Sequence, residues 1–238
     1  MKFHPIPLIT IGLLMSFCAR AQDNSQYRLH LQNEAFIPAK NITTESIADL
    51  DKRTAKFHGR SFVIIQFESI PTISERQQLQ QAGIELLDYI PSNAYTAIVK
   101  GTPDVNALLR TKARALFEPQ PVQKMQPVLA KGIFPAHAVK VPGTIDVWVS
   151  FPKIFTANEV TSELQQKNID IVNTQYKTYR ILCLRLSQQR IAELAGLPFI
   201  EYVQPAPNED QYLNLKSMAS TRANVIKAIH GRRRFTLA

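Results

Sequence analysis

The side chains best suited to metal binding or nucleophilic catalysis in this chain are five histidines and two cysteines. The histidines are His4, His30, His58, His137 and His230. None lies four residues from another histidine or beside a cysteine, so no metal-binding spacing is present. The sequence also has no Gly-x-Ser-x-Gly turn, phosphate-binding loop or dinucleotide-binding motif. We therefore expect a protein that is not an enzyme and needs no metal or other cofactor; an enzyme of an unrecognised type is the weakest alternative.

The first 21 residues have the organisation of a secretory signal peptide. Lys2 gives a positive start, residues 6–17 form a short apolar run, and residues 19–21 (Ala-Arg-Ala) are typical of a cleavage site. The apolar run is too short to anchor the chain in a bilayer. We expect cleavage between Ala21 and Gln22, and a product that is secreted, periplasmic or at the cell surface.

The two cysteines lead to different expectations. Cys18 would be removed with the signal peptide, and Phe17 stands where a lipoprotein would have a small residue, so lipidation is not favoured. Cys183 lies in the alternating apolar run 179–186, which favours a small buried core residue over a reactive thiol. The mature chain would then have a single cysteine and no internal disulfide.

The formal net charge of +9 is spread along the chain, apart from a cluster at Arg232-Arg-Arg234. Such a spread is typical of a solvated surface and is compatible with an acidic partner. An exported chain without aromatic RNA-binding motifs is not expected to bind nucleic acid. No second apolar segment approaches the length of a membrane span, so we expect no stable membrane insertion after signal cleavage.

A long internal repeat indicates how the rest of the chain is organised. Leu79-Gln-Gln-Ala-Gly-Ile84 recurs as Leu164-Gln-Gln-Lys-Asn-Ile169, and Phe117-Glu-Pro-Gln-Pro121 recurs as Val203-Gln-Pro-Ala-Pro207. The offsets of the two pairs are 85 and 86 residues, so their order and spacing are kept together. A repeat of this length predicts one small domain used twice rather than a solenoid.

Both copies show the same order of elements, which is strand, helix, strand, strand, helix, strand. In the first copy, apolar patterns and turn residues predict strands at 62–67, 84–90, 94–99 and 115–118, and helices at 72–82 and after Asp104. In the second copy they predict strands at 145–151, 169–174, 180–186 and 199–203, and helices at 157–167 and 188–194.

These elements divide the chain into six segments. They are a signal peptide (1–21), a polar lead-in with one helical piece at 44–50 (22–60), a first module (61–126), a semi-rigid proline-containing linker (127–143), a second module (144–207) and a C-terminal linker (208–238). The element order predicts an α+β fold made of two tandem ferredoxin-like βαββαβ modules. Each module would carry both helices on one face of an antiparallel sheet, and the bare face would need a partner or solvent-compatible residues.

Four segments carry a resemblance to a known family. They are Gly59-Arg-Ser-Phe-Val-Ile-Ile-Gln-Phe67, Gly83-Ile-Glu-Leu-Leu-Asp-Tyr-Ile-Pro-Ser-Asn-Ala-Tyr95, Leu197-Pro-Phe-Ile-Glu-Tyr-Val203 and Ser220-Thr-Arg-Ala-Asn-Val225. Together they resemble the N-terminal part of secreted subtilisin-like serine peptidases of Bacteroidetes-type bacteria, over all but the last few residues of the chain. In that family such regions precede the catalytic domain and are similar to inhibitor-type propeptides with the βαββαβ fold.

The resemblance implies a prodomain fragment that acts as chaperone and inhibitor of a subtilisin-like protease domain, its partner in cis in full-length relatives. It also implies that the chain after the last strand runs through the protease cleft as an added strand. In this sequence that tail consists of Gln204, Pro205, Ala206, Pro207, Asn208, Glu209 and Asp210.

No residue of the sequence matches the catalytic motifs of this family. Residues 232–238 stand where the catalytic part would be expected to begin, which we interpret as truncation. The alternative is a free-standing secreted protein-binding or protease-inhibitor module, for instance an adaptor for export or surface assembly.

Overall fold

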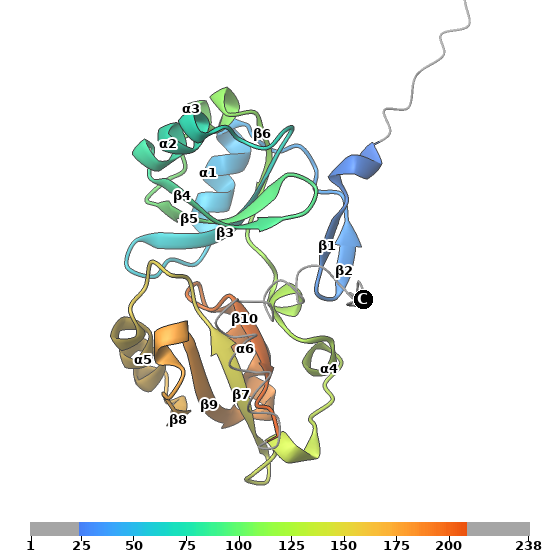
Figure 1. Ribbon diagram of the computed structural model, residues 1–238, viewed down its shortest axis with the longest axis vertical. Helices are drawn as coiled ribbons and strands as arrows, with labels where there is room; N and C mark the ends of the chain where they lie inside the picture. Colours follow the sequence, from blue (N-terminus) through green and yellow to red (C-terminus); the bar gives the residue numbers. More distant parts are fainter. Residues whose placement is uncertain (1–23, 209–238) are drawn as a thin grey trace, which may run out of the picture.

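The computed structural model describes residues 24–208, which form an α+β fold. Two four-stranded antiparallel sheets and one two-stranded hairpin are accompanied by short helices (Figure 1). The first sheet and its helices lie at one end of the molecule and the second sheet lies at the other. The α+β class and the antiparallel sheets expected from the sequence are therefore confirmed.

The first sheet consists of β3 (Arg60–Phe67), β4 (Ile84–Ile90), β5 (Ala94–Lys100) and β6 (Ala113–Phe117), in the order β4-β5-β3-β6. One of its faces is covered by α1 (Thr44–Arg53), α2 (Ile73–Gln81) and α3 (Val105–Arg110). On that face Val63, Ile65 and Phe67 of β3 pack with Leu79 of α2 and Leu108 of α3. Because each buried side chain of this size contributes about 1.5–3 kcal/mol, this stripe decides which face the helices cover.

The second sheet consists of β7 (Thr144–Ser150), β8 (Asp170–Asn173), β9 (Ile181–Ser187) and β10 (Tyr202–Pro205), in the order β10-β7-β9-β8. Its core face packs against α5 (Ala157–Gln166) and α6 (Ile191–Gly196), the latter preceded by the 3₁₀-helix η5 (Gln188–Arg190). Alternation along β7 places Ile145, Val147 and Val149 on this face, where they pack with Val160 and Leu164 of α5. The apolar alternation in the sequence predicted this face correctly.

The two sheets have the same connectivity. When the strands of each copy are counted along the chain, the first strand lies between the third and the fourth, and the second lies at an edge beside the third. All neighbouring strands in both sheets are antiparallel. The internal repeat of the sequence therefore corresponds to a repeat of topology.

The first helix of each copy also begins and ends in the same way. Thr72 and Thr156 are the N-caps, and each exchanges hydrogen bonds with a glutamate three residues further on, which forms a capping box. After the helix, Gly83 and Asn168 have φ angles of 77° and 53°. Glycine and asparagine are the residues that most readily adopt this left-handed conformation, so both helices end at equivalent positions.

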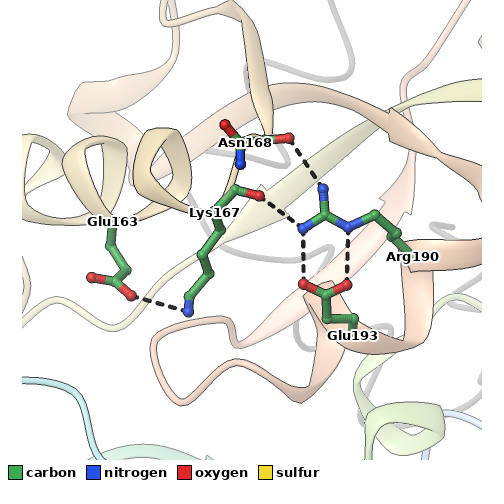
Figure 2. Close-up of polar contacts among 5 residues, drawn as sticks. All are labelled: Glu163, Lys167, Asn168, Arg190 and Glu193. Carbon is green, nitrogen blue, oxygen red and sulfur yellow. Dashed lines mark hydrogen bonds and ion pairs between the residues drawn. The ribbon is translucent and has the colours of Figure 1, made fainter.

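Arg190 connects the end of α5 to α6 (Figure 2). Its guanidinium donates hydrogen bonds to the carbonyl oxygens of Lys167 (2.8 Å) and Asn168 (3.1 Å) and to both carboxylate oxygens of Glu193. Lys167 also forms an ion pair with Glu163, one helical turn earlier. The last carbonyl groups of a helix have no partner within the helix, so Arg190 caps α5 from the neighbouring element.

The other face of the first sheet carries a hairpin made of β1 (Leu29–Leu31) and β2 (Glu34–Phe36). Leu29 and Leu31 are buried there with Ile64 and Ile90. The segment expected to be a polar lead-in with one helical piece thus also contains two strands that pack on the sheet. Strands of three residues are too short to show a recognisable alternation in the sequence.

The turn of this hairpin extends to the second half of the chain. Gln32 Nε2 donates a hydrogen bond to the Tyr202 hydroxyl at 3.2 Å. Asn33 Nδ2 donates to the carbonyl oxygens of Val122 and Met125, at 2.6 and 2.9 Å. The hairpin therefore connects the first sheet to β10 and to the segment between the two sheets.

The remainder of the same face packs against the second half of the chain. Phe62 and Ile98 of the first sheet belong to the core cluster that contains Phe155 and Phe199. The ring of Phe57 lies 5.0 Å from that of Phe155 and 4.6 Å from that of Phe199, centroid to centroid. The expectation of a bare face is therefore wrong for the first sheet, because the hairpin and the second unit both cover it.

The proline-containing linker is also folded. It includes the single turn α4 (Pro127–Ala130) and the 3₁₀-helix η3 (Ala136–Ala138), and the 3₁₀-helix η2 (Pro121–Lys124) lies just before it. Leu129 and Ala138 are buried in the core of the second unit. The backbone N–H of Gln126, the residue directly before the linker, donates to the carbonyl oxygen of Val203 at 2.8 Å, so the start of the linker is held at the last strand.

The last strand begins later than the sequence predicted. A strand was expected at 199–203, but Phe199 and Ile200 are buried core residues that precede β10. The strand also extends past the expected end at residue 203 and includes Pro205. β10 is an edge strand, where a proline can be accommodated without a ladder hydrogen bond.

The helical piece expected at 44–50 and the helix expected after Asp104 are both present as α1 and α3. The N-cap of α1 is Thr43, whose side chain accepts the Ser46 backbone N–H. In α3 the side chains of Ala107 and Leu108 are buried, whereas that of Leu109 is exposed.

Candidate protein-binding surface

The face of the second sheet that points away from α5 and α6 carries polar and aromatic residues. Alternation along the strands places Asp146 and Trp148 of β7 and Cys183 and Arg185 of β9 on this face. In the strand register Asp146 is opposite Arg185, and Trp148 is opposite Cys183. A band of side chains able to make polar and aromatic contacts therefore crosses the middle of the sheet.

Asp146 and Arg185 form a bidentate ion pair. Arg185 Nε donates to Asp146 Oδ1 at 2.6 Å, and Arg185 Nη2 donates to Oδ2 at 2.8 Å. The Asp146 side chain is only 7% exposed, and burial of an unpaired carboxylate would be costly. The guanidinium of Arg185 balances this charge and so reduces the cost. The hydrogen bond to Asp146 in turn raises the pKa of Arg185.

An aromatic pair covers one end of this face. The rings of Trp148 and Tyr176 are 4.9 Å apart between centroids, and Tyr176 also packs on Ile181. Tyr176 comes from the loop between β8 and β9, next to the 3₁₀-helix η4 (Lys177–Tyr179). Since this loop folds onto the sheet, the face is partly covered by its own chain rather than wholly bare.

A pocket of about 130 Å³ lies on the same face. Trp148, Tyr176 and Cys183 supply its apolar lining, and His137 and Lys140 from the linker supply basic groups. The side chains thus come from the sheet, from the loop between β8 and β9 and from the segment between the two units. The pocket exists only because these separate parts of the sequence are brought together.

Cys183 is half-buried in this pocket and not in the core where the sequence analysis placed it. The residues of β9 that enter the core are its neighbours Leu182 and Leu184. Burial raises the pKa of the Cys183 thiol to about 11, so it is protonated at neutral pH. Since the thiolate is the reactive form, the expectation of an unreactive cysteine agrees with this environment.

The expected tail begins inside the sheet. Gln204 and Pro205 belong to β10 and pair with Trp148 and Val147. The Ala206 backbone N–H donates to the carbonyl oxygen of Asp146 at 2.8 Å. The next residues in the chain, Pro207 and Asn208, line the pocket together with Ala206. Glu209 and Asp210, like the expected cleavage position at Ala21 and Gln22, lie outside the described residues.

The histidines within residues 24–208 are dispersed. His58 Nδ1 lies 3.5 Å from Glu159 Oε1, and His137 lines the pocket. Among residues 24–208, no three histidine, cysteine, aspartate or glutamate side chains are grouped so that they could hold a metal ion. Within the same residues, no helix combines the length and the apolar character required to cross a membrane.

No functional role was expected for Trp148, Tyr176 or Lys140. Trp148 could have been singled out, because it is the only tryptophan and alternates with the core residues Val147 and Val149. No comparable signal existed for Tyr176 or Lys140. Their positions depend on how a loop and a linker fold onto the sheet.

Comparison with known proteins yields one family match. Residues 30–129 match a family model described as a domain of unknown function (DUF8729). The matched range runs from within β1 to within α4, so it contains the first sheet with its hairpin and not the second sheet. Neither a curated protein nor a solved structure matches the chain significantly.

Proposed function

We propose that this chain is a protein-binding prodomain, in which two tandem ferredoxin-like modules act as chaperone and inhibitor of a subtilisin-like serine peptidase domain. The strand order supports the modules, because the first strand lies between the third and fourth in both sheets. The four sequence segments that resemble such peptidases support a subtilisin-like peptidase domain as the partner. The signal-like residues 1–21 support action outside the cytoplasm, in a secreted or cell-surface location.

The observation that carries the proposal is the position of the chain that follows β10. The Ala206 N–H makes the last sheet hydrogen bond, and Pro207 and Asn208 then lie beside the pocket on the polar face. A segment placed in this way can add as a strand to the cleft of a partner while the sheet face contacts the surface around that cleft. The residues from Gln204 to Asp210 are the ones we assign to this contact.

The two units have different roles in this proposal. The first sheet has no free face, because the hairpin and the aromatic cluster around Phe57 cover it. The second sheet keeps Arg185 and the pocket at the surface of its polar face. We therefore assign the partner contact to the second unit and a supporting role to the first.

The chaperone and inhibitor activities have one physical origin. A module that binds the native protease and not its unfolded chain stabilises the native state by linkage, by about 2.7 kcal/mol at a hundred times Kd. The same contact excludes substrate from the cleft until the module is released. Inhibition and assisted folding should therefore be observed together.

The test is to mix the purified chain with the catalytic domain of a subtilisin-like peptidase. We expect slower hydrolysis of a peptide substrate and a higher refolding yield of the denatured catalytic domain, at micromolar concentrations of the chain. Pro207→Asp should weaken both effects, because it places a carboxylate in the contact segment. Pro91→Asp, in an exposed turn of the first unit, is the matched control.

Three outcomes would contradict the proposal in different ways. Undiminished proteolysis together with an unchanged refolding yield would rule out the inhibitor and chaperone activities and favour a free-standing module with another partner. Equal effects of Pro207→Asp and Pro91→Asp would show that the tail takes no part in the contact. Peptide hydrolysis by the chain alone, if it survives repurification, would show that the chain is itself an enzyme.

A further inference from the structure

The pocket on the second sheet has a charge pattern that indicates what it can bind. We propose that it accepts an acidic side chain, aspartate or glutamate, from an extended segment of a partner protein. This inference rests on the proposed function in taking the partner to be a protein, and it adds the chemistry of one contact. It follows from the balance of charge, the hydrogen-bond donors and the shape of the pocket.

The unbalanced charge of the pocket is positive. Asp146 is its only carboxylate among the described lining residues, and Arg185 already binds both oxygens of that carboxylate. Lys140 and His137, by contrast, form none of the ion pairs found among residues 24–208. An ammonium group beside a pocket favours an anionic occupant, and the net charge of +9 attracts an acidic partner over longer distances.

The pocket also offers amide groups for an acceptor. Asn173 Oδ1 accepts the backbone N–H of Gln175 at 2.6 Å. The Nδ2 group of Asn173 has no partner among the described residues, and the side-chain amide of Gln175 is likewise available. A carboxylate only accepts hydrogen bonds, so these donors and the ammonium group of Lys140 suit it better than they suit a cation.

The size and lining of the pocket fit a side chain rather than a single water. A volume of about 130 Å³ is roughly ten times the space that one water molecule needs. Trp148 and Tyr176 form an aromatic wall that can contact the methylene groups of the occupant. Ala206, Pro207 and Asn208 border the same pocket, so a partner chain beside the tail can place a side chain in it.

The occupancy of the pocket can be followed directly, because Trp148 is the only tryptophan of the chain. The probe is a capped pentapeptide of alanines with a central glutamate, titrated into the purified full-length chain while Trp148 fluorescence is recorded. We expect a saturable change at millimolar peptide, and no saturable change with the matched central-glutamine peptide. Added salt should weaken the binding, because an exposed ion pair is screened.

The charge requirement is tested with Lys140→Gln and with Lys131→Gln, an exposed lysine away from the pocket, as the matched control. Loss of one ion pair of about 1 kcal/mol corresponds to a roughly fivefold weaker affinity for the glutamate peptide. Lys131→Gln should leave that affinity unchanged. Circular dichroism of each variant checks that the fold is retained.

Either of two results would overturn the inference. One is that the glutamate and glutamine peptides give the same titration, or that neither gives a saturable change. The other is that Lys140→Gln and Lys131→Gln have equal effects. Failure of the proposed function is distinguishable, because it would appear as undiminished proteolysis by the catalytic domain with the wild-type chain, whatever the peptides do.

Discussion

Lys124 is a buried ammonium group at the junction of the two units, and its titration should be visible in the stability of the fold. Lys124 as a whole is only 5% exposed to solvent. Its Nζ donates to the carbonyl oxygen of Leu197 at 3.0 Å and lies 5.9 Å from the centroid of the Phe62 ring. Burial lowers the pKa of Lys124 to about 8, and the attraction of Glu118 and Glu201 offsets only part of this effect.

The sign of the pH dependence follows from the two states of the chain. The pKa of Lys124 is about 8 in the folded chain and has the ordinary value of 10.5 when unfolded. Between these values the unfolded chain retains a proton that the folded chain has lost, so stability rises with pH across this window. From about pH 7 to about pH 9 the contribution of Lys124 to stability rises by roughly 1 kcal/mol. Well below the folded pKa both states are protonated, and a penalty of about 3 kcal/mol stays constant.

The prediction is tested with Lys124→Met, which removes the titration and keeps most of the side-chain volume. Urea unfolding of the wild type and the variant is measured near pH 7, 8 and 9, with Trp148 fluorescence and circular dichroism as probes. We expect the stability of the wild type relative to the variant to increase by roughly 1 kcal/mol over this range. The contributions of other titrating groups are common to both proteins and cancel in the difference.

Lys131→Met is the control, because Lys131 is exposed and the substitution removes the same charge. Its stability difference from the wild type should not vary with pH. A difference between the wild type and Lys124→Met that is constant from neutral to alkaline pH would refute the reasoning. It would mean that Lys124 is not desolvated at the junction in the folded chain.

Two further predictions concern the second unit. Thr156→Ala should lower the free energy of unfolding by about 1 kcal/mol, because the reciprocal hydrogen bonds with Glu159 are lost; an unchanged thermal midpoint would contradict this. Arg185→Ala should cost about 3 kcal/mol in urea unfolding, because the nearly buried Asp146 loses its partner. Asp146→Asn in the same background should recover part of that loss, and no recovery would show that charge is not the cause.

Much of the fold could be predicted because local signals agreed with one another. The helix expected at 72–82 and the strand expected at 145–151 are both present. Thr72 caps that helix, Gly83 follows its end, and Ile145, Val147 and Val149 alternate along that strand. The repeat then predicted that the elements occur twice in the same order. These signals depend on neighbours within about ten residues, so they can be recognised in the sequence without knowledge of the tertiary structure.

What could not be predicted depends on distant contacts. Leu29 and Leu31 form a strand because the face of the first sheet is apolar, and nothing near them in the sequence shows this. Phe199 looked like a strand residue, but the aromatic cluster around Phe57 holds it in the core before β10 begins.

The candidate site was largely hidden for the same reason. The tail after the last strand was expected to make a contact, and the structure places its residues Ala206, Pro207 and Asn208 beside a pocket. The pocket itself needs Tyr176 from a loop and Lys140 from a linker, and neither lies in a periodic pattern. Surfaces assembled from loops and linkers have little signature in a single sequence.

The hydrogen bond between Gln32 and Tyr202 spans 170 residues, which bears on how the chain folds while it is being made. At a synthesis rate of about 5–20 residues per second, Tyr202 leaves the ribosome on the order of 10–30 seconds after Gln32. During that interval the hairpin can pack on the first sheet, and Asn33 at its tip can bind Val122 and Met125. Gln32 and the aromatic residues at the junction still lack their partners from the second unit. The nascent first unit therefore exposes apolar surface until almost the whole described chain has emerged. We expect the nascent chain to be most prone to aggregation and proteolysis during this interval.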